Sequence, residues 1–422
     1  MAPTVEASVE ELDPHRKRLR AALTDRLVAS MPLAQRVFVL WLATRIGYVG
    51  VTYLTNTLHL LQPGPQVYTG MIFSWDHWDT NWYLLISRLG YFSKTSANFF
   101  PLYPATVGWV SWLFGHGSGP IWPQPDRLRL LVAIGLSNLA LLVGLYAIAR
   151  LAELDADPDD HRAGVRAAWI LLAYPFAMAF TEPLAEGYLL AFAALALLLA
   201  RQGCWYSAAV AAILAGLTRP VAVILVAPLL WEYARQHGWW RWPPGRPGLP
   251  SLRPLAMGAA VAVAAPLGMG IYFTYLYYRF GDFLLPLHDQ LKIWGHASLL
   301  PWETVRLVVQ NLASGVDTFL LPVEVGLIIG FGLITLVSIR RIPFAYTLYM
   351  AGLLYLVTAA PLTNFSDVLI GATRYLAGSI PVFLILARWS ARRPWLQTGL
   401  ISVGIMLQGA IMVAYFQNRL PA

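Results

Sequence analysis

Long apolar stretches recur along almost the whole chain, and they restrict the folds that it can adopt. Several are near 20 residues, enough for a helix that rises about 1.5 Å per residue to cross roughly 30 Å of hydrocarbon. Of the 422 residues, 58% are hydrophobic and 12% are charged, whereas soluble domains carry about 25% charged residues. We therefore predict an all-α, polytopic transmembrane helical bundle of about 11 spans. The stretches are residues 33–58, 128–150, 164–180, 184–200, 204–217, 220–235, 254–278, 318–339, 343–360, 374–390 and 396–416.

The basic residues between these stretches predict the orientation of the bundle. With the N-terminus inside, most of the Lys and Arg residues outside the spans fall on the cytosolic side, as the positive-inside rule requires. Residues 1–32 then form a cytosolic basic tail, 33–416 a single transmembrane domain, and 417–422 a short C-terminal tail. The long segments 59–127 and 279–317 become outer loops, and their aromatic content favours folded structure over disorder.

The segment 101–115 is apolar enough to enter the membrane, but a full crossing there would invert every later loop. We therefore predict a re-entrant or interfacial helix within the first outer loop. Pro175, Pro183 and Pro220 interrupt later apolar stretches. Broken helices of this kind are tolerated in membranes where they line a cavity in the protein.

Charge and cysteine content argue against several classes of protein. The net charge is +8, but the basic residues lie between apolar runs, so attraction to anionic membrane lipids explains them better than nucleic-acid binding. The single cysteine, Cys204, excludes an intrachain disulfide framework and a Cys-based zinc site. No Gly-rich phosphate loop follows a strand pattern, so a Rossmann domain for a nucleotide sugar finds no support.

The first outer loop carries the residues best suited to chemistry, in the sequence FSWDHWDTNWYLLISRLGY from Phe73 to Tyr91. Asp76 and Asp79 are three residues apart, so in a helix both carboxylates lie on one face. Neighbouring aromatic rings exclude water and can stack on sugars, which suits a general base that deprotonates a hydroxyl group. The alternative is an interfacial helix whose acids only face water. The aromatic neighbours that we expect to bind substrate are Trp78, Trp82 and Tyr83.

The strings WDTNWYLLISRLGY (78–91) and FFPLYP (99–104) resemble the first outer loop of the PIG-V family. This family includes the second mannosyltransferase of GPI-anchor assembly and its prokaryotic relatives. Asp79 falls on the family's aspartate and Asp76 does not. Ser87 stands where the family usually has Ala.

Four later segments resemble the same family in the same order. PFAMAFTEPLAEGYLL (175–190) places Glu186 on the acidic position, although Leu184 and Ala185 replace the family's Tyr-Ser/Thr pair, which makes Glu182 a competing candidate. The other three are LTRP with Arg219, FGDFLLPLHDQLKIWG (280–295) with His288, Gln290 and Trp294, and TRYL with Arg374 and Tyr375.

The resemblance implies a glycosyltransferase of superfamily C (GT-C type) that uses a polyprenyl-phosphate sugar donor. It further implies an outer-face site in which Asp79 acts as base, and inverting transfer of mannose to an acceptor hydroxyl of a lipid or glycan. The protein would lie in the plasma membrane of a prokaryote or the endoplasmic reticulum of a eukaryote. Another sugar, a transporter or flippase of lipid-linked sugar, and a scaffold subunit with an inactive site remain alternatives.

The donor's phosphate calls for cations at the membrane surface, and arginine matches phosphate through its planar fork of donors. Arg219 and Arg374 are the main candidates, whereas Arg279 and Lys292 serve equally well by snorkelling to lipid headgroups. Arg45 lies within the first span, where a charge is costly, so it should face the bundle and either pair with a loop carboxylate or bind phosphate.

We expect no cofactor and no metal, because a phosphate leaving group carries less charge than a nucleotide diphosphate. The alternative is Mg²⁺ or Mn²⁺, for which converging carboxylates are suitable ligands. The residues available for such a site are Asp76, Asp79, Glu182 and Glu186.

Overall fold

The computed structural model describes residues 31–58, 67–115, 126–239, 252–314, 320–363 and 367–417. These residues form helices and no strand, so the all-α prediction is confirmed for this part of the chain. The predicted tails, 1–32 and 417–422, lie almost entirely outside the described residues.

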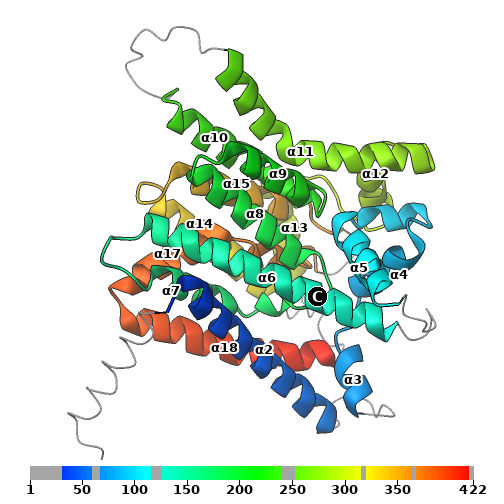
Figure 1. The fold of residues 1–422 in the computed structure, drawn as a ribbon. Coiled ribbons are helices and arrows are strands. Elements are labelled where there is room, and N and C mark those ends of the chain that lie inside the picture. Colours follow the sequence, from blue (N-terminus) through cyan, green and yellow to red (C-terminus); the bar gives the residue numbers. More distant parts are fainter. Residues whose placement is uncertain are drawn as a thin grey trace, which may run out of the picture.

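Five helices in the described ranges are long and apolar enough to cross a membrane. Three of them, α2, α6 and α18, run in similar directions in Figure 1, and α2 packs against both of the others. Their exposed residues are largely apolar, as lipid-facing helices require. The five are α2 (Leu33–Thr57), α6 (Arg127–Asp155), α11 (Leu252–Phe280), α14 (Leu321–Ser338) and α18 (Pro394–Phe416).

The remaining predicted spans form helices shorter than 18 residues, and irregular backbone divides three of them, 164–180, 220–235 and 374–390. The number of helices of spanning length therefore supports a polytopic membrane protein, while the count of about 11 spans stays a prediction. The shorter helices in this part are α7 (Ala163–Leu172), η2 (Ala177–Phe180), α8 (Glu186–Arg201), α9 (Trp205–Gly216), η3 (Pro220–Leu225), α10 (Val226–Gln236), α15 (Phe344–Ala359), α16 (Ala372–Ala377) and α17 (Ile380–Ala391).

Small residues allow the central helices to pack closely. Helix α8 is buried over most of its length between α6, α9 and α10. Helices α9 and α11 cross at Gly216 and Gly268, where an added Cβ would overlap the carbonyl oxygens of Ala265 and Ile213. Glycine is required at this crossing because the two backbones touch.

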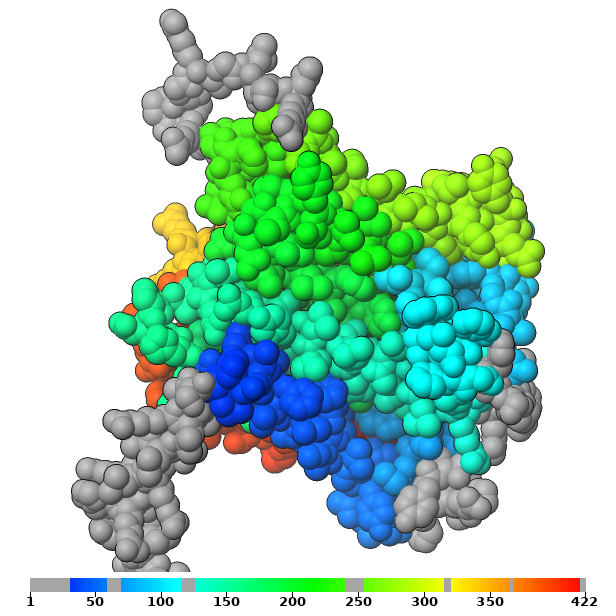
Figure 2. All heavy atoms as spheres, viewed as in Figure 1, coloured from blue at the N-terminus to red at the C-terminus, as the bar shows by residue number. Residues whose placement is uncertain are grey.

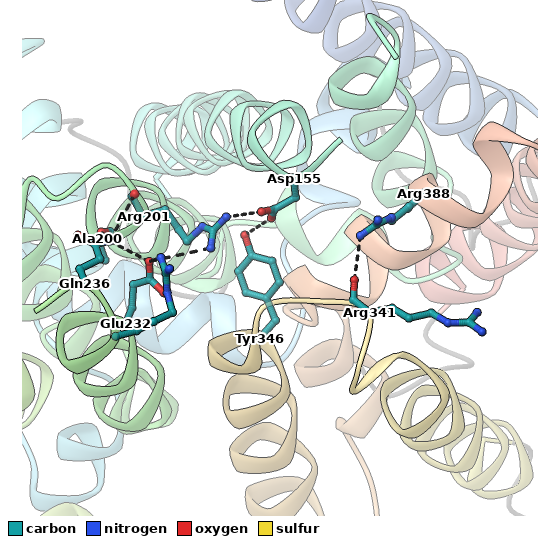
Figure 3. A network of polar contacts seen from close by, with 9 residues as sticks. Asp155, Ala200, Arg201, Glu232, Gln236, Arg341, Tyr346 and Arg388 are labelled. Carbon is teal, nitrogen blue, oxygen red and sulfur yellow. Dashed lines mark hydrogen bonds and ion pairs between the residues drawn. The ribbon is translucent and has the colours of Figure 1, made fainter. Parts of the chain in front are cut away.

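A polar network joins α6, α8, α10 and α15 at one end of the bundle (Figure 3). Tyr346 donates a hydrogen bond of 2.6 Å to Asp155, which also forms an ion pair with Arg201. Nearby, Arg388 donates a hydrogen bond of 2.8 Å to the carbonyl of Arg341. The predicted topology puts Asp155, Arg201, Arg341 and Arg388 on the cytosolic side of the membrane, and the structure places them at one end of the bundle.

Segments of the two predicted outer loops gather at the other end, beside the C-terminal ends of α2, α11 and α18 in Figure 1. Asn98 of η1 donates a hydrogen bond of 2.9 Å to Asp289 of α12, so the two loops are in contact. The helices of these loops are α3 (Val67–Phe73), α4 (Asp79–Leu89), η1 (Lys94–Asn98), α5 (Leu102–Leu113), α12 (Leu285–Lys292) and α13 (Pro301–Ala313).

Helix α5 corresponds to the apolar segment 101–115. It has 12 residues, about 18 Å at the usual rise, which is too short to cross the hydrocarbon. The length suits the predicted re-entrant or interfacial helix, and that assignment stays a prediction.

Candidate functional site

Asp79 is the first residue of α4 and follows an unusual turn. Trp78 has φ 48°, and within the described ranges it is the one non-glycine residue with a positive φ. A non-glycine residue in this region costs roughly 1–3 kcal/mol, so the surrounding structure must hold the turn in place. The Asp79 side chain keeps 25% of its surface exposed, and Oδ2 accepts a hydrogen bond of 3.2 Å from Arg374.

Arg374 reaches Asp79 from α16, a short helix held at both ends by buried tyrosines. The hydroxyl of Tyr174 donates to the carbonyl of Thr373, and that of Tyr349 to the carbonyl of Gly378, each at 3.0 Å. Arg374 is therefore carried by a fixed piece of backbone.

Glu186, the first residue of α8, lies between two arginines. Its Oε1 is 2.9 Å from Nε of Arg374 and forms an ion pair with Arg219. The side chain is only 6% exposed, and Oε2 is buried with no hydrogen bond from the described residues. The helix N-terminus adds a favourable partial charge for this carboxylate.

Arg219 comes from the break between α9 and η3. Its backbone is extended, as the residue before Pro220 prefers. The guanidinium donates a hydrogen bond of 3.4 Å to the Tyr375 hydroxyl and lies 5.2 Å from the centre of that ring. The structure thus brings Arg219 and Tyr375 into the same cluster as Asp79 and Glu186.

Tyr83 forms an aromatic wall of this cluster. It is 4% exposed and packs edge-to-face on Phe99 and Tyr103, with ring centres 5.1 and 5.2 Å apart. Burial raises the pKa of its hydroxyl, and the charges of Arg219 and Glu186 also act on it. A neutral phenol is therefore available at the site as a hydrogen-bond donor.

Glu182 lies beside the cluster, in the turn before α8, and not within it. Burial raises its pKa from 4.5 to about 8, and Arg374 offsets only part of that effect. Glu186 forms ion pairs with both Arg219 and Arg374. Of the two candidates for the acidic position of the motif, Glu186 is therefore the one at the centre of the cluster. With Glu182 protonated, two arginines face two carboxylates and the cluster is electrically balanced.

We predict that Glu182→Gln changes the dependence of stability on pH. Because folding raises the pKa of Glu182, the wild type loses stability as pH rises from about 4.5 to about 8. The glutamine variant lacks this loss. Its free energy of unfolding should therefore rise relative to that of the wild type by at most roughly 1.4 kcal/mol per pH unit in that window. Thermal unfolding of both proteins in detergent from pH 5 to 9 measures the difference.

Asp76→Asn is the matched control for that experiment. Burial raises the pKa of Asp76 from 3.8 to about 6, so its stability difference from the wild type should stop growing near pH 6. A constant difference between Glu182→Gln and the wild type across the whole range would contradict the assignment of a neutral Glu182.

The prediction that Asp76 and Asp79 share a helix face is wrong. Helix α4 begins at Asp79, so Asp76 lies in the preceding turn and the three-residue helical spacing does not apply. Asp76 instead lies near Tyr415 of α18, whose ring also packs against His77 with centres 4.6 Å apart.

The two tryptophans of the first outer loop that we predicted to bind substrate lie at the edge of the site. Trp78 is 53% exposed, and Trp82 stacks on Phe92 and Phe99 with ring centres 6.0 and 5.5 Å apart. Trp294 of the second loop packs edge-on against the same Phe99, at 6.1 Å. The rings of Trp82, Phe92, Phe99 and Trp294 form a continuous aromatic cluster next to Tyr83.

His288 and Gln290 do not join the charged cluster in the contacts that the structure gives. The His288 imidazole is exposed and lies 2.8 Å from Asp282, while Gln290 is half-buried and its carbonyl accepts from the His296 amide. Arg279 contacts the Tyr91 carbonyl at 3.4 Å and Lys292 is exposed, so both fit the snorkelling alternative.

Sequence reasoning missed Glu324 as a residue near the site. It is fully buried in the first turn of α14, where its carboxyl group faces Asp367 and the N-terminus of α16. An acid inside an apolar stretch is itself a signal of a functional or positioning role. Helix α16 thus rests on buried polar groups from α14 as well as on the two tyrosines.

No group of three or more His, Cys, Asp or Glu side chains among the described residues is arranged to hold a metal ion. The four carboxylates that we considered for Mg²⁺ or Mn²⁺ are divided, with Asp79 and Glu186 committed to arginines and Asp76 apart from them. What the cluster can do is hold one partly exposed carboxylate in a fixed position beside two cations.

No protein-family model matches this chain, and no curated protein matches it either. The motif resemblance and the geometry of the site therefore carry the functional argument together.

Proposed function

We propose that this protein is a membrane glycosyltransferase of the GT-C type. It transfers mannose from a polyprenyl-phosphate donor to a hydroxyl group of a lipid-linked or glycan acceptor on the outer face. The observation that carries the proposal is the 3.2 Å contact between Asp79 and Arg374. It brings together two of the five motif segments, which are 295 residues apart in sequence.

The proposed reaction uses Asp79 as the general base. The acceptor hydroxyl loses its proton to the Asp79 carboxylate as its oxygen attacks C1 of the sugar. The bond from C1 to the phosphate oxygen breaks, and a polyprenyl phosphate monoester leaves with the electron pair. Attack from the face opposite the phosphate inverts the configuration at C1.

Arg374 has two roles in the proposed reaction, to orient the base and to donate hydrogen bonds to the substrate. Its contact with Asp79 orients the carboxylate, and the guanidinium keeps further N–H groups for other partners. Glu186 anchors Arg374 and Arg219 together, so both cations are held in position before substrate binds. The aromatic surface of Trp82, Tyr83 and Trp294 then suits stacking on a sugar ring.

The proposal includes the finer topology of about 11 spans with the N-terminus in the cytosol. In that arrangement the candidate site opens on the outer side, among helices of the two outer loops. Another sugar of similar size would satisfy the same contacts, because nothing in the charged cluster distinguishes one hexose from another.

The experiment places purified protein in liposomes made from a total membrane lipid extract, with radiolabelled polyprenyl-phosphate mannose. We expect a new labelled product on thin-layer chromatography, and none when labelled GDP-mannose replaces the lipid donor. Polyprenyl-phosphate glucose in a parallel reaction tests the sugar.

Three outcomes contradict the proposal. Product from GDP-mannose alone excludes the lipid donor. Movement of labelled lipid between leaflets without a new glycosidic bond indicates a flippase. Absence of both product and movement, with correctly folded protein, favours a scaffold subunit.

A further inference from the structure

Helix α13 of the second outer loop has three different sides. One side is buried against the bundle through Thr304 and Val308. A second side is polar and exposed, and it consists of Glu303, Arg306 and Gln310. The third side carries large apolar residues at spacings of three, four and three, so they form one stripe along the helix. The residues of this stripe are Trp302, Val305, Val309 and Leu312, and each is between 47% and 66% exposed.

Helix α12 of the same loop repeats this arrangement. Leu285 and Asp289 are buried, and Asp289 accepts the hydrogen bond from Asn98 that joins the two outer loops. His288 and Lys292 form an exposed polar side. With 3.6 residues per turn, the polar, buried and apolar sides follow one another in the same order around both helices. The exposed apolar stripe of α12 consists of Leu284, Leu287 and Leu291.

The lengths of the two helices exclude a full crossing of the bilayer by either one. Helix α12 has 8 residues and α13 has 13, which gives about 12 and 20 Å against roughly 30 Å of hydrocarbon. Exposed apolar patches with polar borders mark contacts with protein or membrane rather than with water. A short helix that is polar on one side and apolar on another suits the membrane surface, where it lies parallel to the bilayer.

The neighbouring helices indicate that lipid covers the two stripes. Helix α11 runs directly into the second outer loop, and near its end it exposes Tyr275, Tyr277 and Tyr278. Tyrosine is enriched where membrane proteins pass through the headgroup layer. Figure 2 shows the yellow-green end of α11 projecting from the surface beside the first outer loop, in blue and cyan. Helix α14, which follows α13, is one of the five helices of spanning length, so the stripes lie between two lipid-facing segments of chain.

The charges of this region also favour lipid over a second protein. Arg279, Lys292 and Arg306 are all exposed, one at the end of α11 and one on each helix of the loop. Long basic side chains beside an apolar surface place their charges among lipid phosphates. A protein that covered the stripes would have to bury or pair these cations, whereas the headgroup layer neutralises them without burial.

We propose that the second outer loop lies on the outer leaflet of the bilayer, with α12 and α13 as interfacial helices whose apolar stripes are immersed in lipid. The side of the membrane follows from the predicted topology, and the lipid contact does not depend on the proposed function. The loop also connects the membrane surface to the candidate site. Trp294, which follows α12, packs against Phe99 of the aromatic cluster, so the site lies at the level of the lipid headgroups.

The test uses the full-length protein in nanodiscs of phosphatidylcholine and phosphatidylglycerol, with the single cysteine replaced by Cys204→Ser. One new cysteine in each variant carries an environment-sensitive fluorophore. Val309→Cys on the apolar stripe and Gln310→Cys on the polar side are a matched pair in α13, and Leu291→Cys and Lys292→Cys are a second pair in α12. The Val309 and Leu291 labels should emit at shorter wavelength than their partners and lose fluorescence to lipids spin-labelled near the headgroup. The Gln310 and Lys292 labels should instead be quenched by aqueous iodide.

Two results overturn the proposal. Iodide quenching of the stripe labels to the same extent as their polar neighbours places both stripes in water. Protection of the stripe labels from iodide and from spin-labelled lipid alike indicates that a second copy of the chain or another protein covers them. Unfolding temperatures equal to that of the Cys204→Ser protein show that each variant is folded. Sugar transfer is not measured, so a failure of this experiment leaves the proposed function untouched.

Discussion

Asp79→Asn should reduce sugar transfer by roughly 10²–10⁴-fold, the contribution expected of a general base. Asparagine keeps the size of the side chain and can still contact Arg374, but it cannot take the acceptor's proton. The KM for the donor should change much less than kcat. Initial rates of product formation in proteoliposomes, with matched amounts of folded protein, measure the effect.

Asp76→Asn is the control that separates the two loop acids. Asp76 lies before α4 and near Tyr415, and no arginine among the described residues contacts it. Its replacement should lower kcat by less than about tenfold, since it removes no group from the charged cluster. A large loss in Asp76→Asn together with normal turnover in Asp79→Asn would assign the base to Asp76.

The residues of the charged cluster were largely predictable from sequence, because each belongs to a motif beside a helix break. Asp79, Glu186, Arg219 and Arg374 were expected at one face, and the structure brings them into contact. The motifs could not predict which carboxylate pairs with which arginine. That Glu186 holds two arginines and leaves Asp79 partly exposed depends on how α8 and α16 pack.

Other features depend on backbone details that a linear pattern does not contain. Asp76 was placed beside Asp79 on the assumption of a continuous helix, whereas the turn at Trp78 makes Asp79 the first residue of α4 and leaves Asp76 outside the helix. His288 was expected near substrate, yet its imidazole is exposed and its contact is with Asp282. The apolar stretches likewise predicted membrane helices, but proline breaks made several of them too short for length alone to prove a crossing.

Glu186→Gln should cause the largest loss of stability of any single substitution in the cluster. It leaves Arg219 buried without a carboxylate partner, while Arg374 keeps Asp79. Removing one partner of a buried ion pair typically costs about 3–5 kcal/mol, because the remaining charge is neither solvated nor neutralised. Thermal unfolding in detergent should show this as a marked fall in the midpoint.

A double-mutant cycle identifies the cause of that loss. Arg219→Gln removes the unpaired charge, so the variant with both substitutions should be more stable than the sum of the single losses predicts, by more than about 1 kcal/mol. The exposed pair of Arg392 and Asp157, whose side chains are 87% and 66% exposed at 3.4 Å, is the matched control. Surface pairs of this kind contribute about 0–1 kcal/mol.

Additive losses at Glu186 and Arg219 would show that each side chain acts through packing rather than through the other's charge. Coupling well above that of the surface pair would mean that the cluster is a single electrostatic unit. In that case the two cations are fixed before any substrate arrives, and the binding energy of the donor is not spent on assembling them. The same interactions through which Glu186 stabilises the fold would then position Arg374 against Asp79 for the reaction.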